Sequence, residues 1–251
     1  MLFIKNNRIW IYDVGKTSLF EFKLEDFASS HTPEVSKTIK LNTLYLQACM
    51  SEDTFIASSA DIPKYRFDFF NLDGKFLYSK GEYPPNDLSL SDMATKRFYD
   101  FNYTMTSDSK IFTAHFFTDL IEIYDIKGNL IRRCQGPNQY QPRLREKSVG
   151  GGGLFFRPVQ DETYQCYSFF KPVNVKDEIF VLYFGDLYQN FEGNRCSRIL
   201  VFDTDGNPLR IYKLKIPIIS FTVDSEKRII YGVTDRPEKE EDEFNIIKYE
   251  Y

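Results

Sequence analysis

The sequence contains two histidines, His31 and His115, and their positions limit the chemistry that imidazole groups can perform. His115 lies near the end of an apolar segment and Asp119 follows it closely, so an imidazole and a carboxylate can act there as acid and base. A hydrogen-bonded structural histidine is the other interpretation, and we favour it. Two histidines so far apart in the sequence exclude a histidine-rich metal centre. His115 and Asp119 are therefore candidate site residues, for binding rather than for catalysis.

Two glycine-containing segments resemble phosphate-binding loops only in part. Gly15-Lys16-Thr17 has the ending of such a loop, but Trp10 stands where the loop needs a glycine. We interpret this segment as a turn between strands. The four glycines at 150–153 lack a following Lys-Ser/Thr pair, so they predict a flexible loop tip or a backbone that a ligand approaches closely. No G-x-S-x-G segment supports a serine hydrolase of the α/β type.

Acidic segments suggest calcium, but their spacing does not support it. The turns at 73–75 and 203–207 lack both the ligand order and the distant glutamate of an EF-hand, so hairpin turn chemistry explains them. The charged run 236–243 predicts a solvated loop, with an acidic docking site as the alternative. We therefore predict no cofactor and no metal, with calcium as an unsupported option.

The four cysteines show no C-x-x-C spacing, so neither a zinc site nor a thioredoxin-like motif is indicated. We expect buried free thiols at Cys49, Cys134, Cys166 and Cys196. A disulfide between Cys166 and Cys196 is the alternative if the compartment is oxidising.

Aromatic residues in or near long polar segments are the remaining candidates for a binding surface. If they are exposed together, they would suit a protein or glycan partner. If they pack under the loops, they would form a satellite core instead, and the sequence leaves both options open. The candidates are Tyr140, Phe155, Phe156, Tyr188 and Phe191.

The elements that must position these residues are revealed by a repeat. Three segments, at 69–77, 123–131 and 201–209, share one pattern: an apolar strand, a polar turn with a glycine, and a second strand. Alternation of apolar and polar residues then predicts groups of strands around each copy. The groups are 2–5, 8–13, 19–25 and 35–41; 44–50, 54–59, 65–72 and 75–80; 99–106, 110–117, 120–126 and 129–134; 164–173, 178–184, 198–204 and 207–214; and 217–223, 228–234 and 244–251.

Repeated four-stranded antiparallel units predict an all-β fold, a β-propeller with about five visible blades. A β-sandwich is the alternative, but it would not explain the repeated unit. The 24 Phe and 17 Tyr agree with strands, and no segment has a helix-favouring composition. We predict one propeller domain over residues 1–251, lacking an N-terminal blade or a closing strand.

Loop lengths predict that the two faces of this propeller differ. In such blades, first-to-second and third-to-fourth strand connections share one face, and most of them are short here. The long segments fall on the opposite face, apart from an insertion at 26–34. Long loops on a rigid scaffold are where binding usually occurs, although they can also simply cover an apolar rim. The long segments are 81–98, 135–163, 185–196 and 235–243.

Composition excludes several kinds of partner. A net charge of −4 with scattered basic residues argues against a nucleic-acid groove, which would need clustered Lys and Arg. No apolar segment is long enough for a transmembrane helix, and Lys5 interrupts the apolar start, so it is not a signal peptide.

The sequence resembles the TolB-like six-bladed β-propeller proteins that occur as exported lipoproteins in Bacteroides and relatives. The similarity lies in the segments 2–4, 9–13 and 19–22, the strand exits 81–84 and 135–137, and the segments 179–185, 199–209, 229–232 and 246–249. The resemblance implies a sixth blade and a lipidated cysteine upstream of Met1, and an extracytoplasmic location. It implies no catalytic residues, because the family has no assigned activity.

We therefore hypothesise a non-enzymatic propeller that binds a protein, peptide or glycan through the face with the long loops. A metal-dependent propeller hydrolase of the lactonase kind is the alternative, in which carboxylates from several blades would converge on a central metal. A purely structural ring within a larger assembly is the third hypothesis.

Overall fold

The computed structural model describes residues 1–29, 32–51, 53–60, 64–85, 89–107, 109–139, 144–149, 153–158, 166–187, 195–235 and 244–251. Five antiparallel sheets hold nineteen of the described strands, in chain order within each sheet. Blade 1 is β1 (Leu2–Lys5), β2 (Arg8–Asp13), β3 (Ser18–Lys23) and β4 (Lys37–Lys40). Blade 2 is β5 (Tyr45–Met50), β6 (Thr54–Ala60), β7 (Phe67–Asn71) and β8 (Phe76–Lys80).

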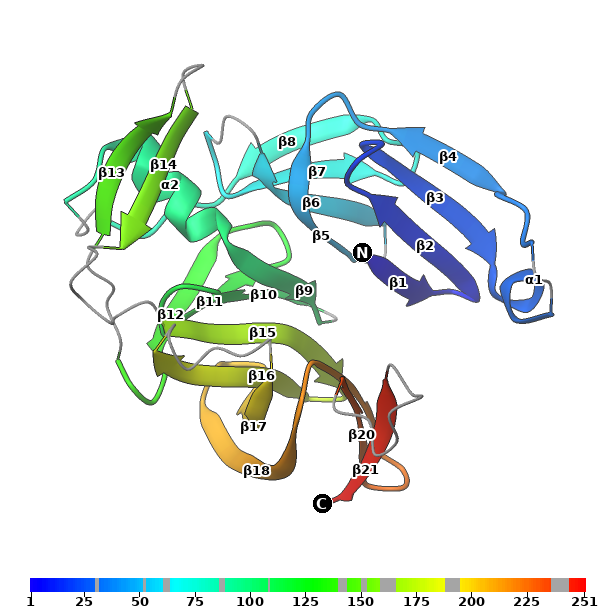
Figure 1. The fold of residues 1–251 in the computed structure, drawn as a ribbon. Helices are drawn as coiled ribbons and strands as arrows, with labels where there is room; N and C mark the ends of the chain where they lie inside the picture. The colour runs from blue at the N-terminus through cyan, green and yellow to red at the C-terminus, as the bar shows by residue number, and fades with distance from the viewer. Residues whose placement is uncertain are drawn as a thin grey trace.

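The other blades follow the same plan. Blade 3 is β9 (Asn102–Thr106), β10 (Lys110–His115), β11 (Leu120–Asp125) and β12 (Leu130–Gln135). Blade 4 is β15 (Cys166–Val175), β16 (Glu178–Leu187), β17 (Cys196–Asp203) and β18 (Pro208–Ile218), and blade 5 is β19 (Ser220–Asp224), β20 (Ile229–Thr234) and β21 (Asn245–Glu250). The sheets are arranged radially with their first strands innermost (Figure 1). The prediction of an all-β propeller with five visible blades is confirmed.

The repeated hairpins owe their shape to one side chain at the start of each turn. The side-chain Oδ1 of Asn71 accepts hydrogen bonds from two backbone N–H groups of its own turn, at 3.0 and 2.8 Å. Asp125 does the same at 2.9 and 2.8 Å, and so does Asp203 at 2.9 and 2.8 Å. A short acceptor side chain that closes its own turn explains why each copy has Asn or Asp at this position.

The glycine of each turn is required for two reasons, its positive φ and its close contact with the preceding blade. Gly74, Gly128 and Gly206 have φ of 80°, 85° and 80°, which favours a residue without a Cβ. Each glycine also packs against the preceding blade. A Cβ on Gly74 would overlap Ile39 of β4, and one on Gly206 would overlap Ile123 of β11. The repeated turn is thus also a repeated contact between blades.

The apolar core is divided among the spaces between blades. One cluster joins blades 1 and 2 around Trp10 and Phe55, and another joins blades 2 and 3 around Phe67 and Tyr124. Two more lie between blades 3 and 4 and between blades 4 and 5. Both sides of the middle blades are therefore buried, as the near-continuous apolar strands require.

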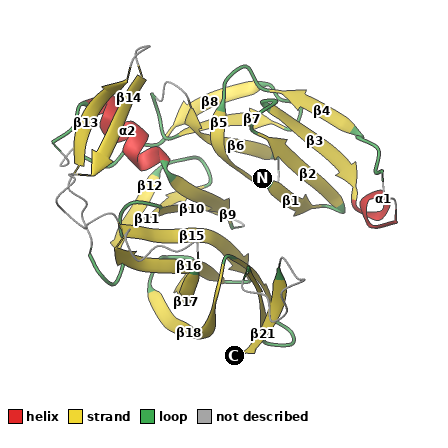
Figure 2. Cartoon of the chain, viewed as in Figure 1, coloured by secondary structure: helices red, strands yellow, loops and turns green. Residues whose placement is uncertain are grey.

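Three elements were missed from the sequence (Figure 2). The helix α2 (Asp92–Asp100) occupies the end of the long segment 81–98. Its last two residues were expected to begin a strand. Ser91 caps the helix by accepting a hydrogen bond from the N–H of Ala94. The helix α1 (Leu24–Ser29) follows β3 directly, and a ribbon of β13 (Leu144–Val149) and β14 (Gly153–Pro158) lies within 135–163. Composition did not indicate these short helices, because capping and tertiary contacts support them.

Neither helix in the described part of the chain has the length and apolarity that a membrane-crossing helix needs.

Candidate functional site

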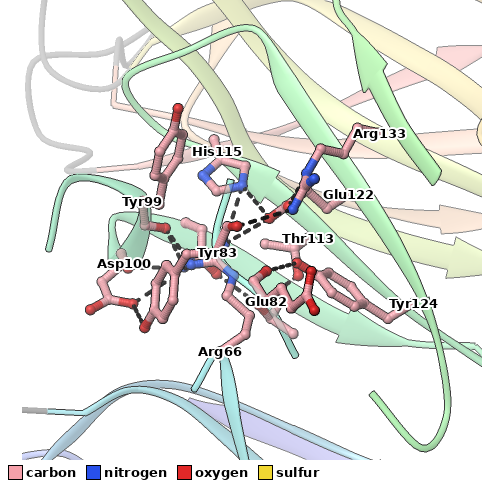
Figure 3. Close-up of polar contacts among 12 residues, drawn as sticks. Arg66, Glu82, Tyr83, Tyr99, Asp100, Thr113, His115, Glu122, Tyr124 and Arg133 are labelled. Carbon is pink, nitrogen blue, oxygen red and sulfur yellow. Dashed lines mark hydrogen bonds and ion pairs between the residues drawn. The ribbon is translucent and has the colours of Figure 1, made fainter. Parts of the chain in front are cut away.

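Second-to-third strand connections and connections between blades leave from one face, which we call the long-loop face; the opposite face is the short-turn face. Five charged or titratable residues in or next to strands and the helix α2 converge between blades 2 and 3 (Figure 3). We call them the buried charge cluster: Arg66, Asp100, His115, Glu122 and Arg133.

Each residue of the cluster is positioned by regular structure. Arg66 directly precedes β7, Asp100 is the last residue of α2, and His115 is the last residue of β10. Glu122 in β11 and Arg133 in β12 are paired in the antiparallel register, so their side chains share the face directed at blade 2. The cluster is therefore as rigid as the sheets that carry it.

Glu122 lies at the centre of the cluster and is fully buried. One oxygen accepts a hydrogen bond from Nε of Arg133 at 3.0 Å, and the other lies 2.9 Å from Nε2 of His115 and 3.3 Å from Nη2 of Arg66. Burial alone would raise the pKa of Glu122, but the two arginines and the histidine outweigh it and lower the pKa to about 2. Glu122 is thus an ionised acceptor at any physiological pH.

Arg66 is the cation that closes the cluster, and its side chain has no exposed surface. Its Nη1 donates to the carbonyl of Tyr99 at 2.7 Å and lies 3.6 Å from the carboxylate of Asp100. The Tyr83 ring lies against the guanidinium, 5.2 Å from its carbon to the ring centroid. Arg66 thereby ties blade 2 to blade 3 and to the end of α2.

His115 is neutral in this setting. Burial, together with the two arginines, lowers the pKa of His115 to about 4, against the opposing effect of Glu122. Its Nε2 lies 2.9 Å from the Glu122 carboxylate, which can only accept, and 3.1 Å from Nη2 of Arg66, which can only donate. Nδ1 has no hydrogen-bond partner among the described residues.

Asp100 has the opposite shift. Burial raises the pKa of this carboxyl group from 3.8 to about 6, although Arg66 and the Tyr83 hydroxyl, which donates at 2.8 Å, partly offset the effect. Asp100 is therefore the group of the cluster that changes its charge closest to neutral pH.

Asp119 belongs to a second network, between blades 3 and 4. Its carboxylate is buried and accepts hydrogen bonds from the Tyr183 hydroxyl at 2.8 Å and from the backbone N–H of Asn138 at 2.7 Å. Asn138 in turn donates to the carbonyl of Gly185 at 2.8 Å. His115 and Asp119 thus do not form a pair: each joins neighbouring blades through other partners.

These two networks are suited to holding the long-loop face in one conformation. His115 and Glu122 are buried and hydrogen-bonded to each other, and Arg133 keeps only 28% of its side chain exposed. Buried polar groups that are linked by hydrogen bonds and ion pairs favour one arrangement of the strands that carry them, although Nδ1 of His115 and Nε of Arg66 have no partner among the described residues. The geometry favours the structural interpretation of His115, and it gives Asp119 a structural role as well.

The remaining candidate residues are not brought together in the described structure. Tyr140, Tyr188 and Phe191 lie outside the described residues. Phe155 and Phe156 lie in β14, of which only the backbone is described. An aromatic binding surface therefore stays a prediction. The alternative disulfide stays untested as well, because the side chain of Cys166 is outside the described set.

Sequence analysis missed Arg66, Asp100, Glu122 and Arg133. One signal was present: Glu122 interrupts the apolar run Leu-Ile-Glu-Ile-Tyr of β11. A charge in a strand that is otherwise buried on both faces indicates a buried ion pair. Arg66 and Asp100 gave no such signal, because they lie outside the blade that carries Glu122.

A central channel of about 720 Å³ is lined by the first strands of all five blades. Its described lining includes Lys5 as the single charged side chain and has no carboxylate or imidazole. Nor do the described residues contain a group of three or more His, Cys, Asp or Glu that could hold a metal ion.

Radial four-stranded sheets around a channel define the class of protein: this is a β-propeller. The sequence model of the TolB-like 6-blade propeller-like family matches residues 1–226, and the chain belongs to that family. A comparison with curated proteins found no match.

A solved structure shows the same fold at low sequence identity. The WD40 domain of Toxoplasma gondii coronin is 11% identical with a TM-score of 0.51, covering 99% of this chain and 54% of that one. The chain thus spans about half the length of that structure. The Cps50 (Swd1) β-propeller domain of Myceliophteria thermophila is 12% identical with a TM-score of 0.46, covering 98% of this chain and 69% of that one.

Proposed function

We propose that this protein is a non-enzymatic propeller that binds a protein, peptide or glycan partner through its long-loop face. One observation carries the proposal: the chain adds α2 and the ribbon β13–β14 to connections that leave from this face, and it braces them. Glu146 of β13 accepts hydrogen bonds from the N–H and hydroxyl groups of Ser91, the N-cap of α2, at 2.9 and 3.0 Å. Arg66 and Asp100 hold the other end of α2.

Bracing of this kind favours recognition of a partner. A surface that is ordered before binding loses less conformational entropy when a partner docks. The helix presents exposed Asp92, whereas the short-turn face presents exposed Lys127 in a turn that only closes a hairpin. The two positions therefore allow a matched test of the two faces.

Site-specific photo-crosslinking in the native cells tests the proposal. A photoreactive amino acid at Asp92 is expected to give a discrete adduct, identified by mass spectrometry, while the same amino acid at Lys127 gives none. Adducts from Lys127 alone, or from neither position at any expression level, would reject the long-loop face as the binding surface.

The hydrolase alternative depends on a metal at the centre of the ring. The described lining of the channel supplies hydroxyl, amide and backbone groups rather than the carboxylates that calcium prefers. Equilibrium dialysis with calcium separates the two functions: tight stoichiometric binding would favour the enzyme, and we expect none.

We also propose that residues 1–251 form a single propeller domain whose sixth blade is supplied upstream, in a protein exported from the cytoplasm. The face of blade 1 that is directed away from blade 2 is apolar, and its Leu2 and Ile4 are 56% and 62% exposed. Blades 1 and 5 flank the open side of the ring (Figure 1). Intact mass and membrane fractionation of the native protein test this: we expect a mass larger by one blade and a lipidated cysteine. A cytosolic protein of the 29.6 kDa given by this chain would contradict it.

A further inference from the structure

A groove of about 570 Å³ lies between blades 3 and 4, at the rim of the propeller. One wall is β12 with the residues that follow it, up to Pro137, and the other is formed by β17 and β18. Leu200 and Phe202 are buried beneath it, at 3% and 4% exposure. The volume is in the range of sites that bind small ligands or short peptide segments.

The equivalent space between blades 2 and 3 is filled. In the repeated hairpins, Glu122 and its partner Arg133 occupy the positions that Leu200 and its partner Ile211 occupy in blade 4. Between blades 2 and 3 this place is filled by the buried charge cluster, with Tyr83 packed on Arg66 and accepting from Arg133 through its carbonyl.

Between blades 3 and 4 the corresponding strand exit is Gln135-Gly136-Pro137, which supplies no aromatic ring. Among the described residues, apolar side chains therefore replace the polar filling, and no aromatic ring of this strand exit covers them. Ile211 stays 54% exposed there, and Leu209 beside it is 46% exposed. An apolar groove left open where the neighbouring interface is filled is a place for another molecule.

The charge of the groove indicates what that molecule carries. Its described lining includes Arg132, Arg133 and Arg210 and no carboxylate, but the Arg133 side chain is directed at blade 2 and that of Arg210 lies over Phe180. Arg133 and Arg210 already pair with Glu122 and Glu178.

Arg132 is the arginine that is left for a ligand. Its hydrogen bonds to described residues are with neutral acceptors: it donates to the side chain of Asn207 at 2.7 Å and lies 3.4 Å from the carbonyl of Asp205. A positive charge at the end of an apolar groove complements a carboxylate that follows apolar side chains.

The backbone around the groove suits an extended segment. β12 and β18 are the outermost strands of their sheets, so one edge of each has no neighbouring strand in the sheet. Such edges provide N–H and C=O groups for a peptide that runs alongside. One apolar groove beside strands with an unpaired edge suits an extended peptide.

We propose that the groove between blades 3 and 4 binds an extended peptide segment of a partner protein, with apolar side chains over Leu200 and Phe202 and an acidic residue at Arg132. This inference rests on the proposed function in partner binding and names the partner as a protein segment.

The test uses the whole chain and a phage-displayed library of short random peptides. Selected peptides are synthesised with a fluorescent label, and their binding is titrated by anisotropy against wild type, Ile211→Glu, Arg132→Gln and Leu77→Glu. Leu77 is the matched control, because it occupies in β8 the position that Leu209 occupies in β18, is 45% exposed, and does not line the groove. Equal melting temperatures confirm that each variant is folded.

We expect the selected peptides to combine apolar residues with an acidic one. Ile211→Glu should weaken their binding by about tenfold or more, a factor that corresponds to about 1.4 kcal/mol. Arg132→Gln should weaken binding and reduce its dependence on salt, and Leu77→Glu should change neither.

Three results would overturn the inference. The first is a library in which no selected peptide binds Ile211→Glu more weakly than wild type. The second is a set of selected peptides that lack acidic residues and bind Arg132→Gln as tightly as wild type. The third is a dimer in light scattering that Ile211→Glu converts to a monomer. Crosslinking at Asp92 without groove-dependent peptides would reject the groove alone. Groove-dependent peptides without that crosslink would instead reject the long-loop face.

Discussion

At the short-turn face, blades 2, 3 and 4 end in three copies of one turn, and the copies agree in hydrogen bonds and in φ. At the long-loop face the same three blades differ. Blade 2 contributes Asp68, which accepts from Tyr45 at 2.5 Å, blade 3 has Glu122 between two arginines, and blade 4 has Leu200 beside an open groove.

The difference shows that different interactions specify the two faces of one repeated scaffold. The short-turn face is specified by local chemistry, because each turn is closed by its own Asn or Asp and its own glycine. The long-loop face is specified by side chains from separate strands, as in Tyr45 with Asp68, or from separate blades, as in Arg66 with Glu122, and each set of contacts there is unique. We therefore expect charge to control the stability of the long-loop face and backbone geometry to control that of the short-turn face.

The largest effect should come from Glu122→Gln. This change leaves Arg66 buried without its main anion, and breaking a buried pair in this way costs about 3–5 kcal/mol. Urea unfolding of the purified variant measures the change in the free energy of unfolding.

Glu178→Gln is the matched control, because it breaks a bidentate pair with Arg210 in which both side chains are about a third exposed. That loss should stay within about 1 kcal/mol. Equal losses in the free energy of unfolding would mean that the buried charge cluster stabilises the fold no more than an exposed ion pair does.

Alanine at a turn glycine should come next. Gly206→Ala forces positive φ on a residue with a Cβ and presses that Cβ into Ile123, which together should cost about 2–4 kcal/mol. Gly15→Ala is the control, because its Cβ would meet nothing closer than 3.4 Å. Thermal unfolding compares the two. A harmless Gly206→Ala would contradict the double requirement for glycine.

The pH dependence of stability should separate His115 from Asp100. The pKa of His115 is lowered from 6.5 to about 4, so its contribution is present above pH 6.5 and is lost as the pH falls through that window. The pKa of Asp100 is raised from 3.8 to about 6, so its contribution is present at low pH and is lost as the pH rises. The two slopes oppose each other, and each is at most about 1.4 kcal/mol per pH unit.

Urea unfolding between pH 4.5 and 6 resolves the two groups. This window lies between the folded and unfolded pKa values of both Asp100 and His115. Relative to wild type, His115→Gln should gain stability as the pH falls, and Asp100→Asn should lose it. Parallel pH profiles for all three proteins would show that neither group is coupled to folding.

The smallest effect should come from the acceptor of a single turn. Asp203→Ala removes two hydrogen bonds to backbone N–H groups at a solvated turn, which should cost about 1 kcal/mol. Asp73→Ala, whose side chain is 78% exposed, should cost less than about 0.5 kcal/mol. Chemical denaturation compares the losses in the free energy of unfolding of the two variants. A larger loss for Asp73→Ala would show that the turn acceptor does not stabilise the repeated hairpin.

Much of the architecture was predictable from sequence because it is local. All nineteen blade strands occur where alternation and turn residues place them, with ends that differ by a few residues. The helix α2 was not predictable in the same way: its cap residue Ser91 was visible, but a cap becomes informative only when the apolar side of a helix has something to pack on.

The candidate site was predicted only in part. The spacing of His115 and Asp119 suggested that they act together, but the structure places them in separate networks. His115 meets Glu122 across a hairpin, and Asp119 meets Tyr183 of the next blade. Spacing along a chain does not reveal partners on another sheet, and no repeat pattern marks contacts that occur once.

The sequence by itself determined the blade: period-two strands, Asn or Asp at the start of a turn, and glycine where φ is positive, because these are interactions between near neighbours in the chain. The tertiary structure decided which side chains of neighbouring blades contact one another. Whether the space between two blades holds an ionised Glu122 or an open groove over Leu200 depends on groups from different blades. Burial and charge act through distances in space, and the fold sets those distances.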